Sequence, residues 1–174
     1  VKNRIPWLCV LMISGTLSAF VIGMYQSLLD SVVMLSSFMT IITGTGGNAG
    51  SQASVSVIRA LSLGEIKFCN AVKVLWKEFR VSILCGVTLA AANFIKLMIF
   101  DLNGKENALF IGLVVSLTLI GTIIMAKLIG SFLPMVAHKI GVGPAVMASP
   151  LITTICDALS LLIYFGIATA VLHI

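Results

Sequence analysis

Charged residues are scarce in this chain of 174 residues. They make up 10% of the sequence, the acidic residues number only 6, and hydrophobic residues reach 59%. Soluble globular domains carry about 25% charged residues. The composition therefore excludes an ordinary soluble domain and predicts an all-α membrane protein with several spans.

Paired metal-binding or redox motifs are also lacking. The four cysteines show no CxxC spacing and lie in or near apolar segments, so we interpret them as small hydrophobic residues rather than as a zinc or disulfide framework. No histidine stands beside a serine or cysteine to activate a nucleophile, and we predict no catalytic residues and no enzyme.

The formal net charge of +5 does not indicate a nucleic-acid partner, because the basic residues flank the apolar stretches. Such flanking charge is typical of membrane proteins, whose cytoplasmic loops are rich in Lys and Arg. We therefore expect the lipid bilayer, and no nucleic acid, as the surroundings of the chain.

Five segments have the length of a membrane span, which requires about 20 residues. We expect them near 6–28, 32–57, 79–100, 108–136 and 144–172, within a single domain that covers residues 1–174. Basic residues collect before the first segment and in the connections after the second and fourth. This alternation predicts a cytoplasmic N-terminus and an external C-terminus.

Two smaller expectations concern charged residues near these segments. The connection 63–76 is too charged to span a membrane, and the sequence leaves open whether it is a short interfacial helix or a solvated linker. Lys96 and Lys127 are expected to extend toward the interface from helix ends.

The last apolar stretch contains an acidic residue, Asp157. Placing such a side chain near the bilayer centre costs about 2.5 kcal/mol or far more, and the residue normally faces a cavity or a partner. Spacings of three or four residues put four residues on one helical stripe with it: Pro150, Thr153, Ser160 and Tyr164. Pro150 has no N–H, so the carbonyl of Val146 would lose its helical donor.

The groups that this stripe offers are oxygens, which hard cations such as magnesium and calcium prefer. The sequence leaves open a second interpretation, in which Asp157 is a neutral, hydrogen-bonded contact between helices.

The second segment is unusually rich in glycine between residues 44 and 50. Gly46 and Gly50 form a GxxxG pair, and two small-residue pairs flank it, so we expect close helix contacts on more than one side. The backbone at Gly44 is a candidate to line a wet path. Asn48 is a second costly polar group, which either lines that path or bonds a neighbouring helix.

Two motifs resemble those of the MgtE family of magnesium channels. The first is Gly44-Thr-Gly-Gly-Asn-Ala-Gly-Ser-Gln52, followed by Arg59-Ala-Leu, and the second is Pro150-Leu-Ile-Thr-Thr-Ile-Cys-Asp157, followed by Leu161-Leu-Ile-Tyr-Phe-Gly166. The opening Arg4-Ile-Pro-Trp-Leu8 also fits the start of that family's membrane part, and the resemblance covers essentially the whole chain.

The resemblance implies a homodimer in a bacterial cell membrane, with the second and fifth segments of each protomer lining a pore on the two-fold axis. It implies that Asp157 from both subunits forms the central magnesium site and that Asn48 and the Gly44 backbone belong to the pore lining. Family members usually carry a cytosolic N-terminal domain and paired CBS domains, and we expect this chain to lack both.

Magnesium sheds water reluctantly, so we expect a hydrated ion between two carboxylates. Thr153 and Thr154 would accept hydrogen bonds from its water shell. The expected ligand and transported ion is therefore Mg²⁺. The alternatives are a secondary-active divalent cation transporter, for example one that couples Mg²⁺ efflux to Na⁺, and a structural membrane module.

Overall fold

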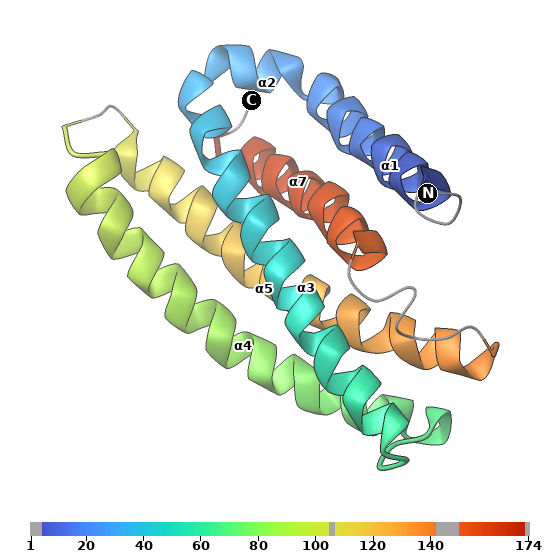
Figure 1. Cartoon of the computed structure of the whole chain (residues 1–174). Helices are drawn as coiled ribbons and strands as arrows, with labels where there is room; N and C mark the ends of the chain where they lie inside the picture. Colours follow the sequence, from blue (N-terminus) through green and yellow to red (C-terminus); the bar gives the residue numbers. More distant parts are fainter. Residues whose placement is uncertain (1–4, 105–106, 142–149, 173–174) are drawn as a thin grey trace.

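The chain forms long helices packed side by side. The computed structural model (Figure 1) describes residues 5–104, 107–141 and 150–172, and no strand occurs within these ranges. The described helices of 20 residues or more are α1 (Ile5–Met24), α3 (Met39–Ser62), α4 (Ala71–Lys96), α5 (Ala108–Lys139) and α7 (Pro150–Leu172). The predicted all-helical fold class is confirmed.

Three of these helices, within the described residues, are long and apolar enough to cross a membrane: Phe68–Asp101, Ala108–Lys139 and Pro150–Leu172. Helix α3 has 24 residues, or about 36 Å at 1.5 Å per residue. Its length suffices for a span, but its Thr, Gly, Asn, Ser and Gln residues make it less apolar. Spans through α1 and α3 therefore stay predictions.

Short irregular elements connect the long helices. Helix α2 (Gln26–Ser31) and the 3-10 helix η1 (Val33–Phe38) follow α1, and the π-helix η3 (Leu97–Asp101) extends α4. The first helix was expected to continue to residue 28, but a turn interrupts it at Tyr25. At this turn the Tyr25 ring stacks on Phe165 of α7 with 4.8 Å between centroids.

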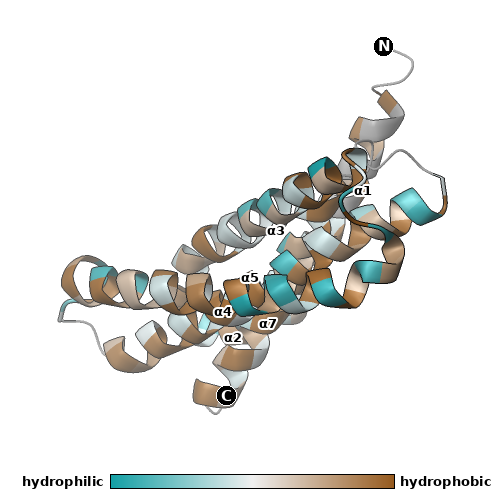
Figure 2. Ribbon diagram, turned by 90° about the horizontal axis from the view of Figure 1, so that it is seen from below, coloured by the Kyte–Doolittle hydropathy of each residue, from teal (hydrophilic) through white to brown (hydrophobic). Residues whose placement is uncertain are grey.

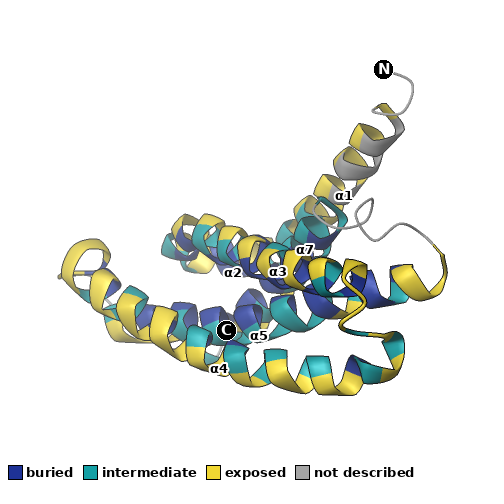
Figure 3. Cartoon of the chain, turned by 60° about the horizontal axis from the view of Figure 1, so that its bottom comes forward, coloured by how far each residue is buried: buried dark blue, intermediate teal, exposed yellow. Residues whose placement is uncertain are grey.

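Helix α5 lies at the centre of the arrangement and contacts α3, α4 and α7, whereas α1 packs on α7. Figure 3 shows buried residues on the facing sides of α3, α5 and α7, and mostly exposed residues along α1. In Figure 2, hydrophilic residues gather at the end of the molecule where α3 ends and α4 begins, while the helices are otherwise largely hydrophobic. This distribution agrees with a membrane protein.

The buried side chains form separate clusters along the helices. The cluster at the start of α3 is large and contains aromatic and branched residues, including Leu35, Phe38, Tyr164 and Phe165. The middle cluster is made mainly of small residues and comprises Ala49, Ile123, Ala126, Ile152 and Cys156. Small residues at this level let the helix backbones approach one another closely.

Helix α3 ends in a glycine turn. Gly64 has a φ of +71°, a conformation that glycine adopts without steric cost. The N–H of Glu65 donates to the carbonyl of Ala60 at 3.0 Å, and the N–H of Gly64 donates to that of Leu61 at 3.1 Å. These two hydrogen bonds give donors to carbonyl groups in the last turn of the helix.

The non-helical connection between α3 and α4 is short. The 3-10 helix η2 (Phe68–Asn70) and the start of α4 at Ala71 take up most of residues 63–76. The third span was expected to begin at residue 79, where charged residues give way to apolar ones. The helix starts earlier because Ala71 is buried against Val57, Leu61 and Met135 at the end of α3 and α5. Its charged side chains Lys73 and Lys77 remain exposed.

Lys127 lies well inside α5, which continues to Lys139. Its Nζ is 3.9 Å from Oε2 of Glu78 on α4, and the two side chains are 12% and 16% exposed. Lys127 therefore finds its counter-charge on the neighbouring helix instead of extending to the interface from a helix end. Lys96, the last residue of α4, pairs with Asp101 at 2.8 Å.

Candidate functional site

Asp157 lies in the N-terminal half of α7 and is half-buried. It lines a cavity of about 250 Å³ between α1, α3 and α7. Hydroxyl groups and apolar side chains share this lining: Ser18, Ile22, Met39, Thr40, Thr43 and Leu161. Asp157 therefore borders a partly polar space rather than apolar side chains alone.

The backbone of α3 lies directly against this carboxylate. A Cβ added to Gly47 would be 3.3 Å from Oδ1 of Asp157 and 3.4 Å from Cγ2 of Thr153. Glycine at this position leaves Asp157 and Thr153 the room that they occupy. The glycine-rich part of α3 and the acidic part of α7 thus form a single site.

Two neighbouring glycines of α3 contact two other helices at once. A Cβ on Gly46 would meet Ser160 of α7 and Thr122 of α5, and one on Gly50 would meet Cys156 of α7 and the Ala126 carbonyl of α5. The expectation of close contacts on more than one side of this helix is therefore confirmed.

The hydroxyls of Thr153 and Thr154 both donate to the carbonyl of Pro150, each at 2.9 Å. These bonds use the single hydroxyl proton and orient the oxygen lone pairs, which accept hydrogen bonds. Helix α7 begins at Pro150, so the carbonyl of Val146 lies outside the described residues.

The C-terminal part of the predicted stripe on α7 is structural. Ser160 is fully buried and donates to the carbonyl of Cys156 at 2.5 Å. Tyr164 is fully buried and donates to the carbonyl of Leu35 at 2.9 Å. Tyr164 thus ties α7 to the segment before α3, and Ser160 bonds within its own helix. Of the five stripe residues, Asp157 is the one that lines the cavity.

Gly44 and Asn48 lie on another side of α3 and are exposed. A Cβ on Gly44 would meet nothing within 4 Å. Asn48 lines an open groove of about 630 Å³ together with Ser51, Gln52, Val55 and Ser56. A single chain therefore brings Asp157, Thr153 and Gly47 together but leaves Gly44 and Asn48 on an uncovered, partly polar helix face.

Asp157 has no ion-pair partner among the described residues, where the ion pairs are Lys96–Asp101 and Lys127–Glu78. Nor do three His, Cys, Asp or Glu side chains gather anywhere in that part of the chain. A single chain offers one carboxylate surrounded by hydroxyls, which suits weak binding of a hydrated cation better than a closed metal site.

Sequence reasoning missed the α1 and α3 residues of this cavity. Thr40 and Thr43 lie seven and four residues before Gly47, spacings that put them on its face of the helix, so this signal was present. Ser18 of α1 has no such signal, because which face of α1 meets α7 depends on tertiary packing.

Comparison with protein families identifies the family of this chain. The model of the MgtE family, described as a divalent cation transporter, matches residues 39–167, from the start of α3 to beyond Asp157. The chain belongs to the MgtE family. The matched range contains both motifs on which the resemblance was based.

Three curated MgtE proteins, each named magnesium transporter MgtE, are similar over nearly the whole chain. The protein of Bacillus subtilis is 40% identical over 171 residues, covering 98% of this chain and 37% of that protein. The protein of Enterococcus faecalis is 36% identical, with coverage of 97% and 36%. That of Thermus thermophilus is 32% identical, with coverage of 98% and 36%. The chain thus spans little more than a third of the length of these MgtE relatives.

Proposed function

We propose that this chain is the membrane part of a magnesium transport protein and that Mg²⁺ passes Asp157 on its way through the membrane. The observation that carries the proposal is the half-buried Asp157 carboxylate, which lines a hydroxyl-containing cavity and packs on the backbone of Gly47. Membership of the MgtE family and the magnesium transporters among its relatives support the choice of ion.

The exposed face of α3 supports a dimer. Gly44, Asn48 and Gln52 follow one another at four-residue intervals and are uncovered in the single chain. Polar side chains and open backbone of this kind are unfavourable against lipid tails. A second copy covers this face, and α3 and α7 of both copies then line a pore on the two-fold axis, with the chain spanning the cell membrane through α1, α3, α4, α5 and α7.

The ion is held through its water shell. Two Asp157 carboxylates match the charge of one Mg²⁺, and magnesium keeps several waters when one or two carboxylates bind it. Thr153 and Thr154 accept hydrogen bonds from these waters, and Asn48 and the Gly44 carbonyl add to the polar lining near Asp157. Because no ligand cage encloses the ion, it can leave as well as enter.

A neutral, nearly isosteric replacement of Asp157 tests this proposal. Asp157→Asn should lower Mg²⁺ flux into proteoliposomes by about ten-fold or more, since a lost charge beside a divalent ion costs more than about 1.4 kcal/mol of ion stabilisation. The matched control is Asp30→Asn, which changes an exposed acid on α2 whose bond to Gln26 is retained by the asparagine oxygen. Equal flux in both variants would contradict the proposal.

The oligomeric state of the protein tests the proposed dimer. The purified protein should be a dimer by light scattering in detergent, and a transport-competent monomer would exclude the two-fold pore.

The second candidate is a secondary-active divalent cation transporter, favoured by the interruption at Tyr25 and the 3-10 helix η1 before α3. Broken helices near a midplane acid are typical of transporters. Single-channel currents carried by Mg²⁺ support the channel, whereas flux that stops when a Na⁺ or proton gradient is removed supports the transporter.

A further inference from the structure

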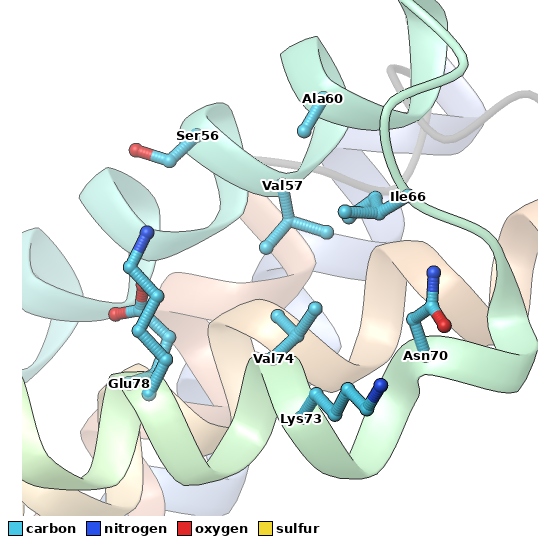
Figure 4. A pocket seen from close by; sticks show the side chains of 9 residues that line it. Ser56, Val57, Ala60, Ile66, Asn70, Lys73, Val74 and Glu78 are labelled. Atoms are coloured by element: carbon cyan, nitrogen blue, oxygen red, sulfur yellow. The ribbon is translucent and has the colours of Figure 1, made fainter.

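A pocket of about 370 Å³ lies away from Asp157, between the end of α3 and the start of α4. Its lining combines an apolar wall with polar side chains: Ser56, Val57, Ala60, Ile66, Asn70, Lys73, Val74, Lys77 and Glu78. Figure 4 shows Val57 and Val74 pointing toward one another across it, with Lys73 next to Asn70 at one end. We propose that this pocket binds the headgroup of an acidic phospholipid.

The charges around the pocket favour an anion. Lys73 and Lys77 stand one helical turn apart and are exposed, and neither pairs with a carboxylate within the described residues. Glu78, the acidic residue of the pocket, has Nζ of Lys127 at 3.9 Å as its counter-charge. Two ammonium groups therefore remain for a phosphate, with the Asn70 amide as an additional donor.

The wall of the pocket favours a lipid over a soluble phosphate. Val57 is 3% exposed, and Ala60, Ile66 and Val74 are partly buried beside it. An inorganic phosphate gains nothing from these side chains. The glycerol and the first methylene groups of a phospholipid bury apolar surface against them, which stabilises the complex.

The pocket also lies at the level where headgroups are found. Trp76 stands between the two lysines in sequence, is 59% exposed and stacks on Phe79 with 5.6 Å between centroids. Exposed tryptophan is enriched at the boundary between headgroups and hydrocarbon. The apolar part of α4 begins at Val81, so Lys73 and Lys77 both lie in the polar first part of the helix, next to this boundary.

Lipid retention tests the proposal. The purified protein is equilibrated with equal amounts of phosphatidylglycerol and phosphatidylcholine in detergent, and bound lipid is counted by native mass spectrometry. The wild type should retain phosphatidylglycerol in preference. Lys73→Gln and Lys77→Gln should each lower that preference about five-fold, and the double variant about thirty-fold.

Two further variants separate the pocket from general surface charge and from misfolding. Lys67→Gln combined with Arg80→Gln removes the same charge from exposed residues outside the pocket and should keep the preference. Ala60→Leu keeps every charge but fills the apolar wall and should lower retention. An equal loss in the Lys67/Arg80 control, or an unchanged Ala60→Leu protein, overturns the proposal. Displacement of the lipid by an equal concentration of inorganic phosphate assigns a soluble-anion site and overturns it as well.

Discussion

The Oδ1 atom of Asp157 lies so close to the backbone of Gly47 that a methyl group on this glycine would approach it to 3.3 Å. This is tighter than most contacts that a Cβ makes, and Cγ2 of Thr153 is at 3.4 Å on the same side. An alanine here would therefore require the carboxylate to shift by a few tenths of an ångström. The relationship connects the glycine-rich helix to the acid that we propose to meet the ion.

Gly47→Ala should lower Mg²⁺ flux without unfolding the protein. The new methyl group displaces the Asp157 carboxylate by a few tenths of an ångström, while alanine in a helix offsets part of the strain by about 1 kcal/mol. We expect a several-fold loss of flux in proteoliposomes.

The matched control is Gly166→Ala on α7, where a Cβ meets nothing within 4 Å. This variant should keep wild-type flux and a melting temperature at least as high. If Gly47→Ala were as active as Gly166→Ala, the close approach of α3 would not matter for transport.

Gly130→Ala should be far more damaging to the fold. A Cβ on Gly130 of α5 would overlap the carbonyl of Gly50 on α3, and backbone cannot move aside as a side chain can. The two helices must separate, and we expect a loss of about 3 kcal/mol or failure to purify as a dimer.

Gly121→Ala on the same helix provides the comparison, because its methyl group would meet only the Cγ2 atom of Ile163, at 3.3 Å. A side chain can adjust there, so thermal unfolding in detergent should change little. Equal melting temperatures for the two variants would mean that α3 and α5 do not approach as closely as described.

Tyr164→Phe should lower stability and leave ion selectivity unchanged. The hydroxyl of Tyr164 donates to the carbonyl of Leu35 at 2.9 Å, and both residues are fully buried. Removing the donor leaves a buried carbonyl without this partner, which costs about 1–3 kcal/mol. Thermal unfolding followed by circular dichroism measures the loss.

Tyr25→Phe is the control for this substitution, since the ring of Tyr25 stacks on Phe165 and a phenylalanine keeps that contact. Its melting temperature should stay near that of the wild type. A change of ion selectivity in Tyr164→Phe with no change of melting temperature would instead indicate that the Tyr164 hydroxyl faces the ion.

The sequence predicted those features that depend on one helix at a time. The cost of Asp157 in an apolar stretch, the three- and four-residue spacing around it, and the small residues near Gly50 all follow from local geometry. The split of the α7 stripe into a cavity-facing part and a structural part did not, because it depends on Leu35 reaching Tyr164 across 129 residues. The start of α4 at Ala71 was missed for a similar reason, since packing against α3 outweighs the charged first turns.

The last prediction concerns the ion pair of Lys127 and Glu78. Substituting both residues should destabilise the protein less than substituting Glu78 alone. Their atoms are 3.9 Å apart and the side chains are 12% and 16% exposed. Glu78→Gln leaves the lysine charge without its partner among apolar helices. We expect a loss of about 2 kcal/mol, below the range for fully buried pairs because both side chains keep some exposure.

Combining Glu78→Gln with Lys127→Met removes the charge together with its partner, and methionine keeps the apolar stem of the lysine. The double variant should recover most of the lost melting temperature, since replacing a pair by apolar groups of similar volume is often neutral or stabilising. A double variant less stable than Glu78→Gln alone would show that Lys127 contributes through another contact and that the pair does not hold α4 and α5 together.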